Sequence, residues 1–513
     1  MPDRPLSAFD AAGFTFLHLD PADTAAIGRH AADTELPALG LSVARLQELS
    51  VQQGPTGARR YLLDLIARRS FAFAAPKTGE EVASGSSVVL SDRSVIYSFP
   101  RAPSIGVAAV RLGEGFPLSA IIDFDRRIVV SIDDPVWGFH TRHLDMLASF
   151  RTSWTAGEVT EPKSMYVLGE QNFAHYALNQ LPVVPDLMDA ARSGTVALIV
   201  THQPLGTVQS LFPELAWDEH LVSENDLHAM NRDGALFIGL GSSRVTAEVA
   251  RRVLESGRRA LGSQARRVMQ ETEGNWPRLW ISVRTSNRTP SNQHDLLFVL
   301  GRRFLQTYAA GCIVIDGLSL PADFESGADR IYSRASFSDI LEHDVGAART
   351  LWSALNELRP GAAHLAVGLG ILDSIVLAGI ADFYFCHHGT VQHKIGWFHA
   401  KPGMIHAGTA IISHRPSDWV ASKSEMALPP AYLDIGLVRD SAAEESDDPR
   451  IRELMRGNYH VDVQGAVQQV MNTLRAVLGN DGETRRTPSA PEDGMLAQIV
   501  RKLRRGLFQP RPR

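Results

Sequence analysis

The chain has 513 residues, of which 44% are hydrophobic and 21% charged, a composition typical of a globular protein with two or three domains. With 51 Lys and Arg against 57 Asp and Glu the net charge is −6, so no overall positive charge favours nucleic-acid binding. The two cysteines, Cys312 and Cys386, exclude a disulfide framework, and the start MPDRPLSAFDAAGF lacks the pattern of a secretory signal. We therefore expect a cytoplasmic protein that binds no nucleic acid.

Residues 1–150 are expected to form an α+β module. The stretches SSVVLSDRSVIYSF (86–99) and SAIIDFDRRIVVSI (119–132) each indicate two short strands around a polar turn. The Asp-Phe-Asp at 123–125 is similar to a metal-binding tripeptide of some sugar transferases. Phe124 between two polar neighbours suits a half-exposed strand equally well, and we expect no metal there.

From about residue 160, short apolar strands alternate with helical segments. The first unit, 160–272, contains predicted strands at 164–169, 195–203 and 235–243. The second unit, 276–420, contains predicted strands at 278–284, 312–317, 382–386 and 404–408. This alternation predicts two doubly wound, Rossmann-like domains. The Gly-Leu-Gly turn within 235–243, before a predicted helix, lacks the third glycine of a dinucleotide fingerprint.

The segment HLAVGLGILDSIVLAGIADFYF (364–385) is long enough to cross a membrane, but it carries Asp373 at its middle and Asp382 near its end. A central Asp costs about 2.5–3.5 kcal/mol on insertion scales. We interpret the segment as a buried helix at about 366–379 followed by a strand at about 382–386.

The C-terminal part is expected to return to the body as a helical region, 421–480. Residues 481–513 combine a linker of flexible composition with the segment MLAQIVRKLRRGLFQ (495–509). That segment places apolar side chains at helical spacing beside four basic ones, which predicts a basic amphipathic helix. Such a helix suits an anionic membrane surface or a protein partner, and it equally suits a capping helix with a solvated face.

Ligands of doubly wound sheets bind beyond the carboxyl ends of the strands, so three loops are candidates for chemistry. In the first, Asn172 and His175 follow a strand and Asn179 lies one helical turn further on. A histidine there can act as a general base, or it can simply be bonded to a backbone carbonyl. In the second, Arg284 and Arg288 precede Asn292, a candidate N-cap of the next helix. They indicate an anion site, or else a solvated pair of surface charges.

The third loop lies in FYFCHHGTVQHKIGWFHAKPG (383–403). His388 and Gly389 end a strand, and the glycine allows a ligand to approach the backbone closely. Zinc could use Cys386, His388 and His393, but nothing nearby clearly supplies a remaining ligand. We expect no metal at this loop.

Together, the three loops resemble glycosyltransferase family 61, the capsular-polysaccharide and glycoprotein sugar transferases. The family's Asn-x-x-His-Trp helix start corresponds to Asn172, His175 and Tyr176, and its following Asp corresponds to Asn179. The family's arginine at a strand end and its Arg…Asn-Glu-x-Glu-Leu step correspond to Arg284, Arg288, Asn292, Gln293 and Asp295. Its His-Gly-Ala-Gly-Leu loop and later Pro-Gly correspond to His388, Gly389, Thr390, Pro402 and Gly403. These matches occur in the same order as in the family, and they span residues 165–410.

The resemblance implies a GT-B architecture, with two Rossmann-like domains facing across a cleft. It implies metal-independent, inverting transfer of a hexose or pentose from a nucleotide sugar to a saccharide or lipid-linked acceptor in surface polysaccharide biosynthesis. No cofactor is expected. His175 would be the catalytic base, with Asn172, Tyr176 and Asn179 on the acceptor side. The donor would contact Arg284, Arg288, Asn292, His388, Gly389, Thr390, His393 and Lys394.

Two other functions remain compatible with this sequence. One is a different GT-B enzyme, such as a nucleotide-sugar epimerase. The other is an inactive GT-B scaffold that binds partners through residues 495–509, which the Asn at position 179 favours slightly. A peripheral location at the inner face of the membrane would follow if this helix binds lipid.

Overall fold

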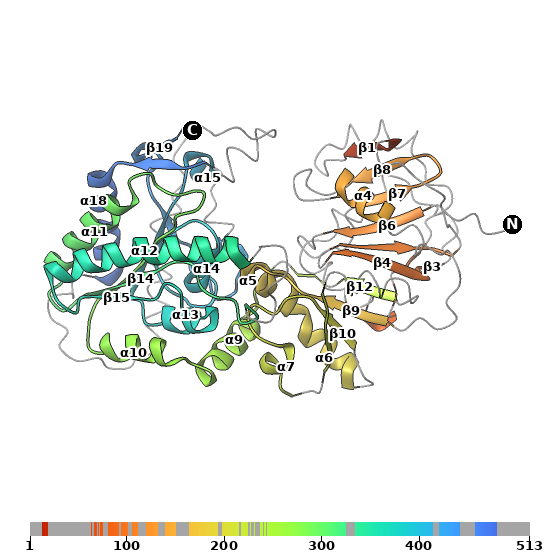
Figure 1. Ribbon diagram of the computed structural model, residues 1–513, viewed down its shortest axis with the longest axis horizontal. Coiled ribbons are helices and arrows are strands. Elements are labelled where there is room, and N and C mark those ends of the chain that lie inside the picture. The colour runs from red at the N-terminus through yellow and green to blue at the C-terminus, as the bar shows by residue number, and fades with distance from the viewer. Residues whose placement is uncertain are drawn as a thin grey trace.

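The computed structural model describes residues 13–18, parts of 63–149, and 164–479 with gaps. The main gaps in the last range are 193–196, most of 224–235, 325–333, 414–419 and 442–456. Three units follow one another along the long axis of the molecule (Figure 1). The predicted linker and amphipathic helix of residues 481–513 lie outside the described residues.

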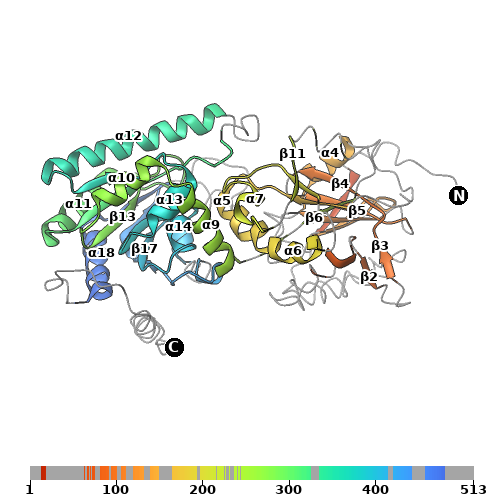
Figure 2. The same cartoon turned by 90° about the horizontal axis from the view of Figure 1, so that it is seen from below.

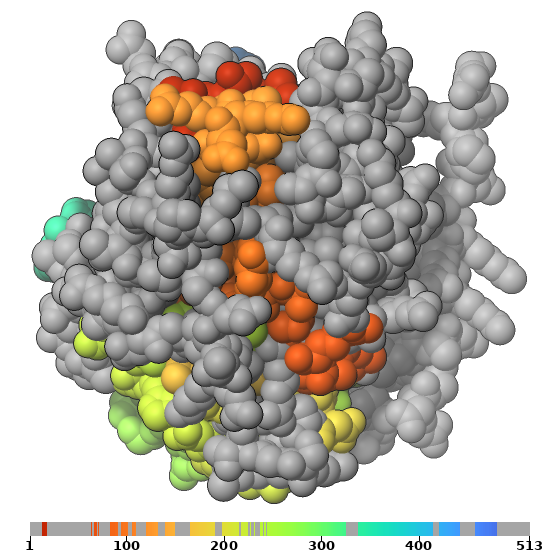
Figure 3. All heavy atoms as spheres, turned by 90° about the vertical axis from the view of Figure 1, so that its right-hand side faces the viewer, coloured from red at the N-terminus to blue at the C-terminus, as the bar shows by residue number. Residues whose placement is uncertain are grey.

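The N-terminal unit is a six-stranded sheet in the order β1-β8-β7-β6-β5-β4. Its neighbours pair antiparallel except β1 and β8, which are parallel. Figure 3 looks onto this unit, with β1 in red beside orange segments. The strands are β1 (Thr15–His18), β4 (Ser86–Ser91), β5 (Ser94–Ser98), β6 (Ile105–Val110), β7 (Ala120–Asp123) and β8 (Ile128–Ser131), and the separate hairpin is β2 (Ala72–Ala74) with β3 (Glu81–Ala83).

Both faces of this sheet are apolar because each face packs against a different part of the protein. Val88 and Ile96 belong to a cluster with helix α4 (Thr141–Ser149). Val89 and Tyr97, one position along each strand, belong instead to the cluster of the first Rossmann-like domain. The sheet therefore lies between α4 and that domain, and the expected α+β module is confirmed.

The first Rossmann-like domain has four parallel strands in the order β11-β10-β9-β12. Its edge strand β12 is covered by the N-terminal sheet: Tyr97 Oη accepts from Gly239 N at 3.1 Å, and Ser87 Oγ bonds both backbone groups of Phe237. The elements are β9 (Ser164–Leu168), α5 (Phe173–His175), a π-helical turn (Tyr176–Gln180), a 3-10 turn (Leu181–Val183), α6 (Val184–Arg192), β10 (Ala197–Val200), α7 (Val208–Leu211), β11 (Asp218–Leu221) and β12 (Leu236–Gly239).

The second Rossmann-like domain has six parallel strands in the order β15-β14-β13-β16-β17-β18. In chain order this is 3-2-1-4-5-6, the doubly wound arrangement whose direction reverses between strands 1 and 4. The strands are β13 (Arg278–Ser282), β14 (Cys312–Asp316), β15 (Ala363–Leu365), β16 (Phe383–His387), β17 (Gly403–His406) and β18 (Ala431–Tyr432). The helices are α11 (Gln293–Thr307), α12 (Arg334–Leu358), α13 (Ile371–Ala378), α14 (Thr390–Gly396) and α15 (Thr409–Ser413). In the view of Figure 2, the long α12 runs along the outer edge of this domain.

The two Rossmann-like domains are joined by α9 (Ala247–Arg259) and α10 (Ser263–Glu271). Helix α9 packs on α13, and Asp373 of α13 accepts from Gly262 N at 2.9 Å. The chain returns near its end, where Val245 pairs with Ser424. A two-stranded ribbon, β19 (Val438–Asp440) with β20 (Tyr459–Val461), leads to α18 (Val463–Leu478), which packs on α11. The predicted α/β fold with two Rossmann-like domains is confirmed.

The apolar segment 364–385 is divided among β15, α13 and β16, so the predicted helix followed by a strand is confirmed and β15 precedes them. The helix is shorter than expected, 371–378, and the strand extends to residue 387. Among the residues that the structure describes, no helix is long and apolar enough to cross a membrane.

Candidate functional site

The carboxyl ends of the central strands of both Rossmann-like domains meet at one place. The first domain contributes the segments that follow β9 and β12, the two strands between which its strand order reverses. The second domain contributes the segments that follow β13 and β16. Asn172 caps α5 through its side chain, and its Nδ2 also donates to Thr390 Oγ1 at 3.4 Å. Helices α5 and α14 pack together, and Figures 1 and 2 place them side by side. The first and third predicted loops are therefore neighbours in space.

On the side of the first domain, His175 is held by an amide. His175 Nδ1 lies 3.1 Å from Asn179 Oδ1, and Asn179 Nδ2 donates to the carbonyl of Ser242 at 2.7 Å. Ser242 follows β12, and its N–H donates to the carbonyl of Asn179 at 2.7 Å. His175 and Asn179 are both half-buried, so the pair lies at the boundary of the protein interior. His175 is thus placed at the convergence of the two domains.

On the side of the second domain, two arginines face a glycine. Gly389 has φ +119°, a conformation that favours glycine. A Cβ at Gly389 would lie 3.7 Å from Arg288 Nη2 and 3.8 Å from Arg284 Nη1. The backbone after β16 and the two guanidinium groups after β13 therefore border the same space. This space lies at the switch point of the sheet, the place between β13 and β16 where the strand order reverses. A phosphate bound there would lie beside two cationic side chains.

Arg288 is a strained and partly desolvated residue. Its φ is +58°, in the left-handed region that non-glycine residues adopt at a cost. Burial lowers the pKa of Arg288, and its Nε is buried without a hydrogen-bond partner. Among the residues that the structure describes, no carboxylate forms an ion pair with Arg288. A buried cation without such a partner is unfavourable, so this position would gain from a bound anion.

The loop that carries both arginines is fixed by a residue that the sequence analysis missed. Asp344 of α12 is buried, and its Oδ1 accepts from both Thr285 N at 2.8 Å and Thr285 Oγ1 at 2.7 Å. Its Oδ2 accepts from Leu318 N at 3.1 Å. One carboxylate thereby ties the segments after β13 and β14 together. No local pattern marks Asp344, because it lies some 60 positions beyond the loop that it holds.

His388 is neutral in this environment. Burial, followed by the charges of Arg288 and Arg284, lowers its pKa to about 4. Its Nδ1 lies 3.2 Å from Tyr432 Oη on β18. A neutral imidazole at this position can take part in hydrogen bonding to a ligand but adds no positive charge.

Three residues predicted to line the site have other roles. Lys394 is buried and donates to Asp316, to the carbonyl of Gly317 and to Ser319, so its ammonium group completes an internal ion pair. The predicted contribution of Lys394 to the donor charge is wrong.

The other two are aromatic side chains of the interior. His393 is buried and stacked on Trp397 with ring centroids 3.7 Å apart, and burial lowers its pKa well below the usual value. Tyr176 is fully buried in the core, so it cannot face an acceptor directly. Helical spacing places residues on a common face but does not show how deep that face lies.

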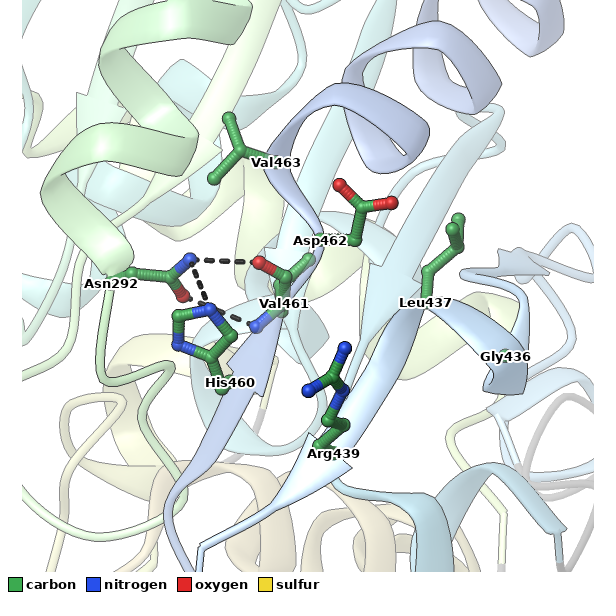
Figure 4. Close-up of a pocket in the computed structure, with 8 residues that line it drawn as sticks. All are labelled: Asn292, Gly436, Leu437, Arg439, His460, Val461, Asp462 and Val463. Atoms are coloured by element: carbon green, nitrogen blue, oxygen red, sulfur yellow. Dashed lines mark hydrogen bonds between the residues drawn. The ribbon is translucent and has the colours of Figure 1, made fainter.

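Asn292 precedes α11 as predicted, but its side chain makes no capping hydrogen bond. Its Nδ2 donates to the carbonyl of Val461 at 2.7 Å, and its Oδ1 accepts from Val461 N at 3.2 Å. Figure 4 shows this amide directed at β20, in a pocket also lined by His460 and Arg439. The predicted capping role of Asn292 is therefore wrong, and its amide braces β20.

The described residues contain no group of three or more His, Cys, Asp or Glu side chains that could hold a metal ion. Cys386 is buried in β16, and burial raises the pKa of its thiol. Asp123 of the Asp-Phe-Asp tripeptide is buried and accepts from Arg126 N at 2.9 Å.

Glu170 and Ser242, like Asp344, were not predicted from the sequence. Glu170 is buried directly after β9 and accepts from Asn172 N at 2.9 Å, which fixes the start of the His175 loop. An acidic residue just after a buried strand was a signal that could have identified it. Ser242 acts through its backbone, for which the sequence carries no signal.

Comparisons with known proteins add little to this geometry. The sequence matches no family model and no curated protein. Similar solved structures include the N-terminal domain of a Candida albicans trehalose-6-phosphate phosphatase, with 9% identity, a TM-score of 0.28 and coverage of 72% of this chain and 73% of that chain. A Burkholderia xenovorans UDP-forming α,α-trehalose-phosphate synthase with glucose-6-phosphate has 9% identity, a TM-score of 0.28 and coverage of 74% and 84%. S. aureus MnaA with UDP has 12% identity, a TM-score of 0.20 and coverage of 60% and 73%. Because these TM-scores are low, we assign the fold from the strand order and register of this structure instead.

Proposed function

We propose that this protein is a glycosyltransferase that moves a hexose or pentose from a nucleotide sugar to a saccharide or lipid-linked acceptor, with inversion and without a metal ion. The observation that carries the proposal is the convergence of two switch points. One presents a histidine held by an amide, and the other presents two arginines beside a glycine. The sequence resemblance described above supports surface polysaccharide biosynthesis as the setting.

The donor side is proposed to bind the diphosphate. When the sugar leaves, negative charge develops on the phosphate oxygen that held it, and preformed cationic groups stabilise that charge. We assign this role to Arg284 and Arg288, and the support for it is that both guanidinium groups lie near the position that a Cβ of Gly389 would occupy. Thr390 and neutral His388 would supply hydrogen bonds to the phosphate or to the sugar.

The acceptor side is proposed to supply the base. The acceptor oxygen attacks the anomeric carbon, and the bond from that carbon to the phosphate oxygen breaks with its electron pair remaining on the phosphate. The hydroxyl proton passes to His175. Such base catalysis typically contributes about 10²–10⁴-fold to the rate.

The proposal is tested with a panel of nucleotide sugars, by measuring the release of the nucleoside diphosphate with and without saccharide acceptors and with and without a chelator. We expect turnover of at least one donor, unaffected by the chelator. Reversible release of a sugar epimer would instead identify an epimerase. Failure of every nucleoside diphosphate to raise the melting temperature would favour a binding scaffold, because a ligand at 100 times its Kd stabilises by about 2.7 kcal/mol.

A further inference from the structure

We propose that Asn179 is a positioning residue that fixes the tautomer of His175, with the segment after β12 as its support. The catalytic role that this inference gives to Asn179 rests on the proposed function. The hydrogen-bond geometry on which it depends is independent of that function.

The tautomer follows from the partners of the amide. Asn179 has one donor group, Nδ2, and one acceptor atom, Oδ1. The Ser242 carbonyl can only accept, so the atom 2.7 Å from it must be Nδ2. The atom that faces His175 Nδ1 at 3.1 Å is therefore Oδ1, which can only accept. It follows that Nδ1 of the neutral imidazole carries the proton and that Nε2 carries the lone pair.

The backbone around Asn179 is shaped to hold this amide. Residues Tyr176–Gln180 form a π-helical turn and Leu181–Val183 a 3-10 turn, so the regular helical hydrogen bonds are interrupted at Asn179. Its carbonyl accepts from Ser242 N instead. Asn179 is thus bound to Ser242 by both its backbone and its side chain, and π-helical turns are frequent at functional sites.

The arrangement provides a neutral orienting group. An amide selects one tautomer by a hydrogen bond but does not carry the negative charge that would stabilise an imidazolium as a carboxylate does. Asn179 therefore sets which nitrogen of His175 can take a proton, and the pair works as a base without a buried charge.

The test uses the full chain labelled with ¹⁵N-histidine, and long-range proton–nitrogen correlation spectra assigned with a His175→Gln variant. The wild-type protein is expected to show the Nδ1–H tautomer at His175. Asn179→Ala should shift His175 toward the Nε2–H tautomer, whereas Asn179→Asp, which retains an acceptor, should preserve the original one. A wild-type spectrum with the Nε2–H tautomer, or no change in Asn179→Ala, would overturn the inference.

Kinetics provide a second readout, separate from folding. With a donor that is turned over, Asn179→Ala should lower kcat by about 10- to 100-fold, the loss that typically follows removal of the hydrogen-bond partner of a metal-ligating histidine. This is smaller than the contribution of about 10²–10⁴-fold from the base itself. KM for the donor should stay essentially unchanged. Asn179→Asp should recover part of kcat. Equal effects of the Ala and Asp variants on kcat would contradict an orienting role.

Asn356 offers a matched control. Its amide also braces backbone, donating to the carbonyls of Trp352 and Ala363 and accepting from Ala363 N, in the region of α12 and β15. Asn356→Ala should leave both the tautomer and kcat unchanged, and a similar loss in this variant would point to general destabilisation. If no nucleotide sugar is turned over, the proposed function fails, and the spectra alone still decide whether Asn179 orients His175.

Discussion

Replacement of Arg288 gives the sharpest test of the donor side, because here binding and stability are expected to change in different directions. Burial lowers the pKa of Arg288, its Nε lacks a partner, and its φ is +58°. Removing the side chain relieves desolvation. Glycine at this position also relieves a conformation that costs about 1–3 kcal/mol. Arg288→Gly should therefore melt at the same temperature as the wild type or higher.

Its effect on binding should be the opposite. A hydrogen bond to a charged group contributes about 1.5–3 kcal/mol, which corresponds to about a 10- to 150-fold weaker Kd for a nucleoside diphosphate. Isothermal titration calorimetry of Arg288→Ala and Arg288→Gly measures this directly. Arg439→Ala is the control, since Arg439 lies exposed in the pocket of Figure 4. An unchanged Kd in both Arg288 variants would refute the assignment of the diphosphate to this loop.

Three further outcomes are expected. Gly389→Ala should lose about 1–3 kcal/mol of stability at φ +119° and bind nucleoside diphosphates more weakly, and calorimetry showing neither would contradict a close approach there. Asp344→Ala should weaken nucleotide binding through a mobile Arg284 loop and lower the melting temperature, whereas Asp344→Asn, which retains one acceptor, should do less of both. For His388, whose pKa of about 4 lies below the usual 6.5, the unfolded state binds more protons between those pH values. Stability should therefore fall as the pH decreases from 6.5 to 4, by at most about 3 kcal/mol from this group. His388→Gln should flatten the melting temperature across that range, and an unchanged slope would show that His388 is not buried in its neutral form.

Much of the fold follows from local patterns in the sequence. Alternation of short apolar strands with helices was sufficient to predict two Rossmann-like domains, and Asp373 was sufficient to reject a membrane span. Strand order was not predictable, because it depends on pairings between segments far apart in the chain, such as β13 with β16. Sheet geometry predicted only that each candidate loop lies at the carboxyl edge of its own sheet. That the loops of the two sheets meet follows from tertiary contacts such as Asn172 with Thr390.

Side-chain direction and burial explain the errors. Lys394 follows a candidate loop, but its partner Asp316 lies 78 positions earlier and draws it into the interior. Asn292 occupies the N-cap position before α11, yet β20 offers its amide two backbone partners. In the same way, the roles of Asp344 and Ser242 arise from contacts between distant segments, which a single sequence does not display.

In the proposed enzyme, donor and base face each other across the two switch points. This arrangement is tested most directly by the release of nucleoside diphosphate from a panel of nucleotide sugars, in the wild type and in His175→Ala, with donor affinity measured alongside. We predict turnover of at least one donor by the wild type and a loss of about 10²–10⁴-fold in His175→Ala, with the Kd of the nucleoside diphosphate unchanged. Equal turnover by both proteins, or no binding of any nucleoside diphosphate, would contradict it.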